Sequence, residues 1–440
     1  MKALGKLKLI AERAKRDKKV KFTSLVHLIN EESLAACYRE LKKDKACGID
    51  GVTVEAYGAN LEGNLKELMR RMKDKRYRPK PVRRVYIPKT GRRGKRPLGI
   101  PSVEDKLVQL MLKKILEAIF EQDFLDCSNG FRPGRSCHRA IDQLDKVVMT
   151  KPINHIVEVD IEKFFDRIRH YWLLRCVEER VSDTNLLWLI RKFLKAGIVE
   201  EGKWIKSLVG TPQGGVVSPL LANVYLHYVL DLWFEKKFRP KAKGHVQMIR
   251  YCDDFVVACE SRKDAERFLT ELSERFSKFG LSLSKDKTKI EQFGRRAWKR
   301  SKVTGEKLST FNFLGFTHYC TTSRRGKFIV GHKTSKLSLA SKLRETKEWI
   351  KKVRSMLPLR DWWPILKAKL IGHYNYFGIS GNMGSLRQFY SQVISMVFKW
   401  INRRSQKKSM NWRKYQRYLQ WYPLPTPVIY HRIYTLSPSR

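Results

Sequence analysis

The sequence predicts an α+β protein in which helices and short strands alternate irregularly. Apolar residues spaced three and four apart, as in Leu61, Leu65, Leu68 and Met72, are typical of amphipathic helices. Short β-branched runs, such as Ile156–Val159, indicate strands. The chain has 440 residues and is 42% hydrophobic and 11% aromatic, which suffices for several packed cores.

The first part of the chain is predicted to be mainly helical. Arg83–Pro88 and Arg96–Ile100 interrupt the helices, and the glycine-containing turn between them predicts a two-stranded hairpin. Its Lys and Arg residues would suit phosphate contact. Helices are expected over 24–45, 60–76 and 103–120, and after the N-cap residue Ser136.

The middle of the chain alternates strands and helices. Two strands stand on either side of an acidic pair, which indicates a hairpin. The expected order is a strand over 156–159, helices over 164–177 and 220–234, strands over 247–251 and 255–259, and a helix over 264–279.

The charge balance identifies the class of partner. Ninety-one Lys and Arg face 43 Asp and Glu, and this net charge of +48 favours nucleic acid, with an anionic membrane surface second. The most apolar stretch, 216–234, is interrupted by Asn223, His227 and Asp231, so it predicts a buried helix and no membrane span. The sequence shows no secretory signal and no C-x-x-C pair. We therefore expect an intracellular location, in the bacterial cytoplasm or nucleoid.

The C-terminal region is basic and aromatic, because no acidic residue follows Asp361. This composition suits a surface that grips phosphates and stacks on bases. It also fits an ordinary basic helical domain with an aromatic core. The aromatic residues concerned are Trp362, Trp363, Tyr374, Tyr376, Trp400, Trp412, Tyr415, Tyr418 and Trp421.

Three acids stand at predicted strand ends. Asp160 follows one strand, and Asp253 and Asp254 separate two others. Adjacent side chains of a regular strand point to opposite faces, so the acidic pair can face one ion only if the chain turns there. Converging carboxylates repel one another unless cations intervene, which predicts Mg²⁺. Turn chemistry alone favours an ordinary hairpin turn for the acidic pair, and the accompanying segments reverse that preference.

The acidic pair is accompanied by several further distinctive segments along the chain. In order, the segments are GIDGVTVEAY (48–57), PKPVRRVYIPKTGRRGKRPLGIPSVEDKLVQ (79–109), NGFRPGRS (129–136), EVDIEKFFD (158–166), GTPQGGVVSPLLANVYL (210–226), RYCDDFVV (250–257), FNFLGF (311–316) and IGHYNYFGISGN (371–382). With these segments, in this order, the chain resembles group II intron-encoded reverse transcriptases and maturases. The family commonly has Ala after the tyrosine of the acidic-pair motif, where this chain has Cys252.

The resemblance implies a right-hand polymerase, with fingers, a palm carrying an antiparallel sheet, and an α-helical thumb. The chain has no Cys-rich or His-rich tail, so the zinc-bearing endonuclease domain of some relatives is expected to be lacking. The implied order is 1–80, N-terminal extension and start of the fingers; 81–155, fingers; 156–320, palm with interleaved fingers elements; 321–400, thumb or maturase region; and 401–440, a short basic nucleic-acid-binding tail.

The resemblance also assigns the catalytic centre. Asp160, Asp253 and Asp254 would be the catalytic metal ligands, with the carbonyl of Ile161 as a further ligand. A pair of Mg²⁺ ions, or Mn²⁺, would activate the primer 3′-hydroxyl and stabilise the leaving pyrophosphate. Phe165 would exclude a ribose 2′-hydroxyl, although it could instead pack in the core.

Cations and a glutamine complete the implied substrate contacts. Lys89 and Arg96 would clamp the triphosphate, and Gln213 would contact the nucleotide unless its loop is a bare turn. Arg132 and Arg135 would contact the template, unless salt bridges tie their loop down.

The expected activity is RNA-directed DNA polymerisation. An RNA template, a DNA or RNA primer and dNTPs are the implied partners, and group II intron RNA is a further one. Two alternatives remain open: a splicing maturase that acts mainly by binding RNA, and a free-standing reverse transcriptase that a host uses in DNA repair or phage defence.

Overall fold

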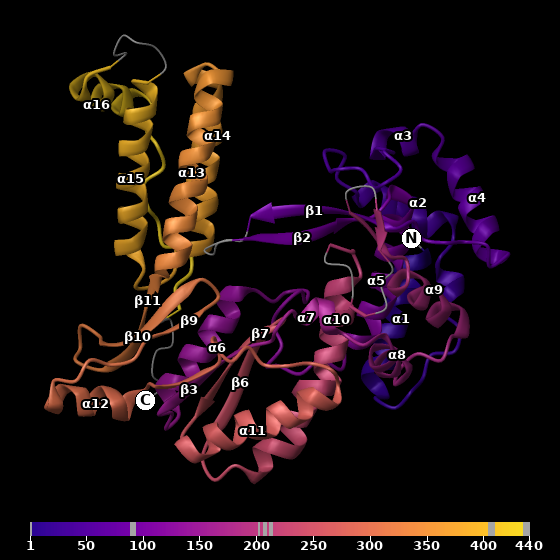
Figure 1. The fold of residues 1–440 in the computed structure, drawn as a ribbon, viewed down its shortest axis with the longest axis horizontal. Coiled ribbons are helices and arrows are strands. Elements are labelled where there is room, and N and C mark those ends of the chain that lie inside the picture. Colours follow the sequence, from indigo (N-terminus) through magenta and orange to yellow (C-terminus); the bar gives the residue numbers. More distant parts are fainter. Residues whose placement is uncertain are drawn as a thin grey trace.

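The computed structural model describes residues 2–88, 94–200, 203–205, 209–210, 214–403 and 410–433. It has the α+β architecture that the sequence predicts, with three sheets among helical layers (Figure 1). Lys89 and Gln213 lie outside the described residues. Among the described helices, none has the length and apolar character that a membrane crossing requires.

The N-terminal helical region packs around the largely buried helix α5 (Val103–Phe120). Ser102 caps this helix by accepting a hydrogen bond from the N–H of Asp105. The helix expected over 24–45 is shorter, because Asn30 and Ser33 form a capping box that begins α2 only at Glu31. The other helices here are α1 (Lys2–Arg16), a 3₁₀ turn η1 (Val26–Leu28), α2 (Glu31–Glu40), α3 (Val54–Gly58), α4 (Leu61–Lys73), α8 (His170–Glu178) and α9 (Thr184–Leu194).

The predicted basic hairpin forms the arm of a four-stranded sheet. β1 (Val82–Pro88) and β2 (Lys95–Ile100) pair antiparallel and project from the helical region (Figure 1). β1 also pairs in parallel with β4 (Ile198–Glu200), which in turn pairs with β5 (Lys203–Ile205). The sheet thus joins the segment at 80–100 to the segment near 200.

The central antiparallel sheet has the strand order β6-β7-β3-β8. Alternate side chains enter two different cores: Val157 and Val159 pack in the core that holds α10 and α11, whereas Ile156 packs on the side of α6. The sheet is therefore buried on both faces. Its elements are α6 (Cys137–Thr150), β3 (His155–Asp160), α7 (Phe164–Arg167), α10 (Ser218–Leu226), the π-helical turns η2 (His227–Asp231) and η3 (Phe234–Phe238), the 3₁₀ turn η4 (Arg239–Lys241), β6 (Val246–Tyr251), β7 (Asp254–Cys259), α11 (Arg262–Lys278) and β8 (Lys289–Gln292).

The C-terminal part is a helical bundle that stands on a three-stranded sheet (Figure 1). Residues 410–433 pack back onto this bundle, because Trp363 Nε1 donates to the carbonyl of Tyr422 and the Tyr374 hydroxyl donates to that of Pro425. The elements are α12 (Arg295–Thr304), β9 (Phe311–Phe313), β10 (Phe316–Thr322), β11 (Phe328–Thr334), α13 (Lys336–Met356), α14 (Leu359–Phe377), α15 (Met383–Ile401) and α16 (Trp412–Trp421).

The aromatic residues of this bundle divide between core and surface. Trp362, Trp363, Tyr374 and Tyr415 are buried in its core, which agrees with the interpretation as an aromatic core. Tyr376, Trp412 and Trp421 are exposed, with Trp421 at 75%. The aromatic-core interpretation is therefore confirmed for the buried residues, and nucleic-acid contact by the exposed ones stays a prediction.

Candidate active site

The acidic pair lies at the turn between β6 and β7. Tyr251 pairs with Asp254, so Cys252 and Asp253 form a two-residue hairpin loop. Cys252 has a φ of 60°, a left-handed conformation that such loops require and that non-glycine residues rarely adopt. The tight hairpin predicted from the adjacent acids is confirmed.

Asp160 ends β3 and pairs directly with Asp254 of the neighbouring β7. Directly opposed residues of antiparallel strands project from the same face, with Cβ atoms about 4.5–5.5 Å apart. Asp160 and Asp254 therefore present their carboxylates side by side, with Asp253 one residue away in the turn. This register brings together the three acids that the sequence singled out.

The backbone around Ile161 is fixed at this site. The N–H of Glu162 donates to the carbonyl of Ser282 at 2.9 Å, and the N–H of Ser284 donates to the carbonyl of Asp160 at 2.9 Å. These two bonds flank Ile161 and continue the pairing of β3 beyond its last residue. The role of the Ile161 carbonyl as a metal ligand stays a prediction.

The acids perturb one another electrostatically. Desolvation by the surrounding protein, together with the charges of Asp253, Asp160 and Glu158, raises the pKa of Asp254 to about 7. The Asp254 side chain keeps contact with solvent, so water screens part of this effect. Burial likewise raises the pKa of Glu158 to about 7, although the N–H of Asn312 donates to this carboxylate. The site thus concentrates negative charge that a cation would neutralise.

Lys287 is a charged residue of this site that the sequence analysis missed. Its Nζ lies 2.8 Å from Asp160 Oδ2, and both side chains are partly exposed. Lys287 belongs to the segment 284–288 that precedes β8. This lysine-rich segment lacks the regular spacing of apolar residues that would predict a helix or a strand, so its sequence resembles that of a solvated loop. Only the pairing of the segment with the end of β3 brings Lys287 to the acids.

A buried arginine holds the acidic turn in place. Arg250 is fully buried, and its guanidinium binds both carboxylate oxygens of Asp231. It also donates to Asn223 Oδ1 at 3.0 Å, to Ser128 Oγ at 2.8 Å and to the carbonyl of Cys252 at 2.9 Å. Arg250 thus connects α10, η2 and the loop at 128 to the strained residue of the hairpin. Asn223 and Asp231 are two of the polar residues that interrupt the apolar stretch 216–234.

The loop at 128–135 packs against the same turn. A Cβ on Gly130 would lie 2.4 Å from the backbone N of Cys252, so only glycine allows this approach. Arg132 is 7% exposed and its guanidinium binds Glu121 and the carbonyls of Leu125 and Ser128.

The other arginine of the loop is also engaged within the protein. Arg135 Nη1 binds both the carbonyl and the carboxylate of Asp126. The contacts of Arg132 and Arg135 agree with the interpretation of a loop tied down by salt bridges. Template contact by these arginines stays an untested prediction.

Two adjacent phenylalanines on α7 have different surroundings. Phe164 is buried, whereas Phe165 is only partly buried and packs against the edge of the core. Their rings meet edge to face at 5.3 Å. One ring therefore belongs to the core and the other remains available beside the end of β3.

Of the residues predicted to contact the triphosphate or the base, Arg96 lies within the described residues and is exposed on β2. Lys89 and Gln213 lie outside the described residues. Gly214, next to Gln213, has a φ of 111°, and a Cβ there would lie 2.3 Å from the carbonyl of Gly99. The loop at 214 thus packs directly on β2, the strand that carries Arg96.

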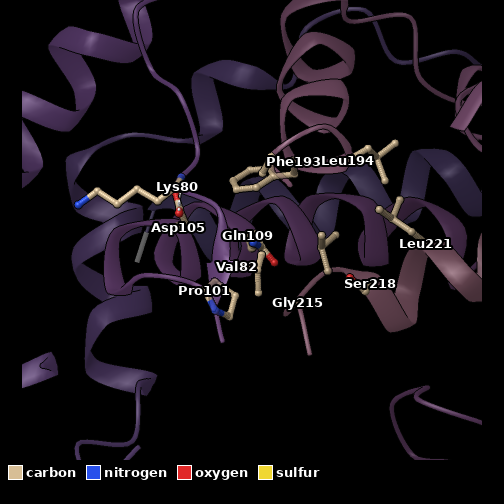
Figure 2. A pocket seen from close by; sticks show the side chains of 12 residues that line it. Lys80, Val82, Pro101, Asp105, Gln109, Phe193, Leu194, Gly215, Ser218 and Leu221 are labelled. Atoms are coloured by element: carbon tan, nitrogen blue, oxygen red, sulfur yellow. Dashed lines mark hydrogen bonds between the residues drawn. The ribbon is translucent and has the colours of Figure 1, made fainter. Parts of the chain in front are cut away.

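A small cavity lies behind this contact. Its volume is about 20 Å³, and Figure 2 shows Gly215 and Ser218 on one side and Asp105 and Gln109 on the other. Burial raises the pKa of Asp105 to about 6. Gln109 Oε1 makes no hydrogen bond within the described part of the chain. A cavity of this volume can hold one water molecule and is too small for a nucleotide.

The donor set at the β6–β7 turn fits hard divalent cations. Asp160 and Asp254 share one face, Asp253 adjoins them, and carboxylate oxygens are the ligands that Mg²⁺ prefers. The raised pKa of Asp254 results in part from like charges that a cation would offset. The residues present therefore fit a divalent-cation site at the end of β3.

Comparisons with known proteins agree with this geometry. Residues 87–318 match the family described as reverse transcriptase (RNA-dependent DNA polymerase). The group II intron-encoded protein LtrA of Lactococcus lactis subsp. cremoris is 29% identical over 450 residues, covering 84% of this chain and 72% of LtrA. Protein YkfC of Escherichia coli (strain K12) is 33% identical over 317 residues, covering 64% of this chain and 82% of YkfC. The mitochondrial nuclear intron maturase 4 of Arabidopsis thaliana is 30% identical over 155 residues, which are 33% of this chain and 18% of that protein.

The matched residues 87–318 are more than half of the chain and include β3, the β6–β7 turn and the loop at 214. The α+β architecture agrees with the right-hand polymerase fold that the resemblance implied. The chain therefore belongs to the reverse transcriptase family and is an RNA-directed DNA polymerase.

Proposed function

We propose that the chain adds deoxynucleotides to a primer 3′-end at the β6–β7 turn, with Asp160, Asp253 and Asp254 as the catalytic acids. The observation that carries this assignment is the pairing of Asp160 with Asp254 beside a two-residue turn that holds Asp253. No other acidic group among the described residues combines a strand-end position in the matched region with a carboxylate directly opposite.

Mg²⁺ is the proposed metal, and Mn²⁺ could replace it. When bound, divalent ions would lower the pKa of the primer 3′-hydroxyl and stabilise the leaving pyrophosphate oxygen. Asp160 and Asp254 would hold the ions from one face of the sheet, and Asp253 from the turn. The Lys287 ammonium, 2.8 Å from Asp160, would partly neutralise the acids while no ion is bound. Arg250 would keep the turn in the orientation that this arrangement requires.

The incoming dNTP is proposed to bind between β2 and α7. Arg96 would contact the triphosphate, as would Lys89, and Gln213 would contact the nucleotide. Phe165 would limit the space beside the sugar, which the partial burial of its ring supports. The close packing of Gly214 on Gly99 would hold the residues next to Gln213 against β2, the strand that carries Arg96.

Asp253→Asn tests the assignment, because the amide keeps the size of the carboxylate and removes its charge. Primer extension on poly(rA)/oligo(dT) with dTTP and Mg²⁺ should be abolished. RNA affinity, measured by filter binding, should stay close to that of the parent protein. Asp286→Asn, in the loop next to Lys287, removes a charge from the same surface and should retain extension. Retained extension in Asp253→Asn would refute the proposed site.

We further propose that the chain binds group II intron RNA and assists its splicing. LtrA is named as a group II intron-encoded protein, and the plant relative is named as an intron maturase. The supporting feature is the C-terminal bundle, where exposed Trp412 and Trp421 stand beside exposed cations of α16. Because 410–433 pack on this bundle, residues 321–403 and 410–433 would act as one thumb.

Splicing assays would separate the two roles. If the chain is a maturase, Asp253→Asn should still stimulate splicing of its intron RNA while lacking primer extension. If the chain polymerises DNA but does not stimulate splicing of any intron RNA that flanks its gene, the result would favour the host-adapted alternative.

A further inference from the structure

Three buried ionisable side chains meet at the junction of the central sheet and the C-terminal bundle, away from the acidic turn. Asp145 lies on α6, His318 on β10 and His332 on β11, and all three are fully buried. One ligand atom from each lies within 4.8 Å of the others. We propose that this cluster, called the Asp145 cluster below, is a structural zinc site.

The hydrogen bonding of His332 leaves its second nitrogen facing an acceptor. Its Nδ1 lies 3.3 Å from the carbonyl of Ser380, which can only accept, so Nδ1 carries the hydrogen. Nε2 then faces Asp145, 3.0 Å from Oδ2 and 3.2 Å from Oδ1. An unprotonated nitrogen and a carboxylate repel each other at this distance unless a proton or a metal ion joins them.

The surroundings of His318 favour a metal ion over a proton between His332 and Asp145. The His318 ring stacks on Phe311 at 4.7 Å, and neither ring nitrogen has a partner with normal hydrogen-bond geometry among the described residues. A proton between His332 and Asp145 would leave this buried imidazole unpaired, whereas a metal ion would use its Nδ1, which lies 3.9 Å from Asp145 Oδ1.

The donor types suit zinc, which binds His nitrogen and Asp oxygen in proteins. Two imidazole nitrogens and one oxygen of Asp145 supply three donors, and the second oxygen of the same carboxylate can complete the site only as a distorted bidentate contact. Bond lengths of about 2.0–2.2 Å place the donors of a tetrahedral zinc ion about 3.4 Å apart. The two distances from a histidine nitrogen to an Asp145 oxygen, 3.0 and 3.9 Å, lie on either side of this value. The contact from His332 Nδ1 to the Ser380 carbonyl is the second hydrogen bond that zinc-bound histidines usually make.

Such an ion would join elements far apart in the sequence. It would bind α6, which packs on the central sheet, to β10 and β11, which support the bundle, and the contact to Ser380 extends the junction to the loop after α14. The site would also offset the charge of Asp145, whose pKa is raised by burial. Zinc at this junction would fix the bundle relative to the acidic turn.

The test uses untagged full-length protein, purified without added metal and dialysed against Mg²⁺ buffer. Metal analysis should find about one zinc per chain. His318→Gln and His332→Gln should each lose this zinc and melt at a lower temperature. The matched control is His373→Gln, because His373 is also buried and stacks on Phe389, and neither of its nitrogens has a hydrogen-bond partner among the residues that the structure describes. It stands outside the Asp145 cluster. This control should keep its zinc.

X-ray absorption of the parent protein keeps the proposal falsifiable if the variants fail to fold. Nitrogen and oxygen neighbours at about 2.0–2.2 Å would support the site, whereas sulfur at about 2.3 Å would place the zinc on cysteines and overturn it. Absence of stoichiometric zinc, or unchanged zinc in both folded histidine variants, would also overturn it. Asp253→Asn should keep the zinc while losing primer extension, which separates this site from the proposed catalytic one.

Discussion

Asp254 is the residue whose protonation should respond most to a bound cation. Its pKa of about 7 means that the ion-free folded protein keeps a proton that the unfolded chain releases near pH 4. The folded state therefore binds more protons between these values, and stability without divalent ions should fall as pH rises through this range. Binding of Mg²⁺ requires the ionised carboxylate, so the apparent Mg²⁺ affinity should rise from about pH 6 to about pH 8.

Magnesium titrations of primer extension and of the melting temperature at both pH values would check this expectation. Asp254→Asn cannot ionise, so the part of the pH dependence that Asp254 causes should disappear from its melting curves. Equal Mg²⁺ affinity at both pH values in the parent protein would contradict the proposed linkage.

Phe165 and Phe164 provide a matched pair for testing sugar selection. Phe165→Ala removes a partly exposed ring beside the end of β3, so ribonucleotide incorporation relative to deoxynucleotide incorporation should rise, by about tenfold for each 1.4 kcal/mol of lost discrimination. Phe164→Ala removes a buried ring and should instead cost about 3–5 kcal/mol of stability. Single-nucleotide extension with dTTP and UTP, together with urea unfolding, measures both effects. Unchanged discrimination in folded Phe165→Ala would count against its assigned role.

The β6–β7 hairpin depends on elements that are distant in the sequence. Arg250→Met should destabilise the protein by about 3–5 kcal/mol, because it leaves the carboxylate of Asp231 buried and unpaired. Urea unfolding measures this loss. Primer extension should also fall, since Cys252 would lose the hydrogen bond that its carbonyl accepts from Arg250.

A second substitution separates charge burial from positioning. Arg250→Met combined with Asp231→Leu removes both charges, so much of the lost stability should return. Primer extension should remain low, because the bond to Cys252 is still missing. Recovery of both stability and activity would show that the arginine serves only to neutralise Asp231.

Two helices depart from the bounds that apolar spacing along the sequence predicts. The helix predicted over 164–177 is broken at Ile168 and Arg169, which are extended between α7 and α8. Both halves have helical apolar spacing, and the interruption serves the packing of Gly210, whose N–H donates to the carbonyl of Ile168. The helix predicted over 220–234 changes to π-helical turns after Leu226, where Asp231 binds Arg250. Both departures occur where the backbone or a side chain contacts a residue distant in the sequence.

At the scale of the whole molecule, the high positive charge should make nucleic-acid binding strongly salt-dependent. Deleting 401–440 would be a poor test, because Tyr415 is a core residue and the carbonyl of Tyr422 accepts a bond from Trp363. Arg413→Gln with Lys414→Gln removes two exposed charges of α16. If these residues contact phosphates, the slope of log affinity against log salt should fall by about 0.7 to 0.9 per lost contact.

The matched control for α16 lies on the opposite part of the molecule. Lys263→Gln with Lys278→Gln removes two charges from α11, which packs beneath the central sheet (Figure 1). This double variant has the same net charge as the α16 double variant, and it should keep the slope of log affinity against log salt that the parent protein shows. Equal slopes in the two double variants would indicate that only the overall charge matters.

The sequence by itself determined the fold class, the basic hairpin, the acidic turn and the class of partner. These features follow from local periodicity, turn chemistry and composition, which need no knowledge of distant contacts. Only the tertiary structure decided that Trp362 is core and Trp421 is surface, that Arg132 is committed to Glu121, and that Lys287 reaches Asp160. Such outcomes depend on strand register and on the pairing of buried charges, and both arise from residues that meet only after the chain has folded.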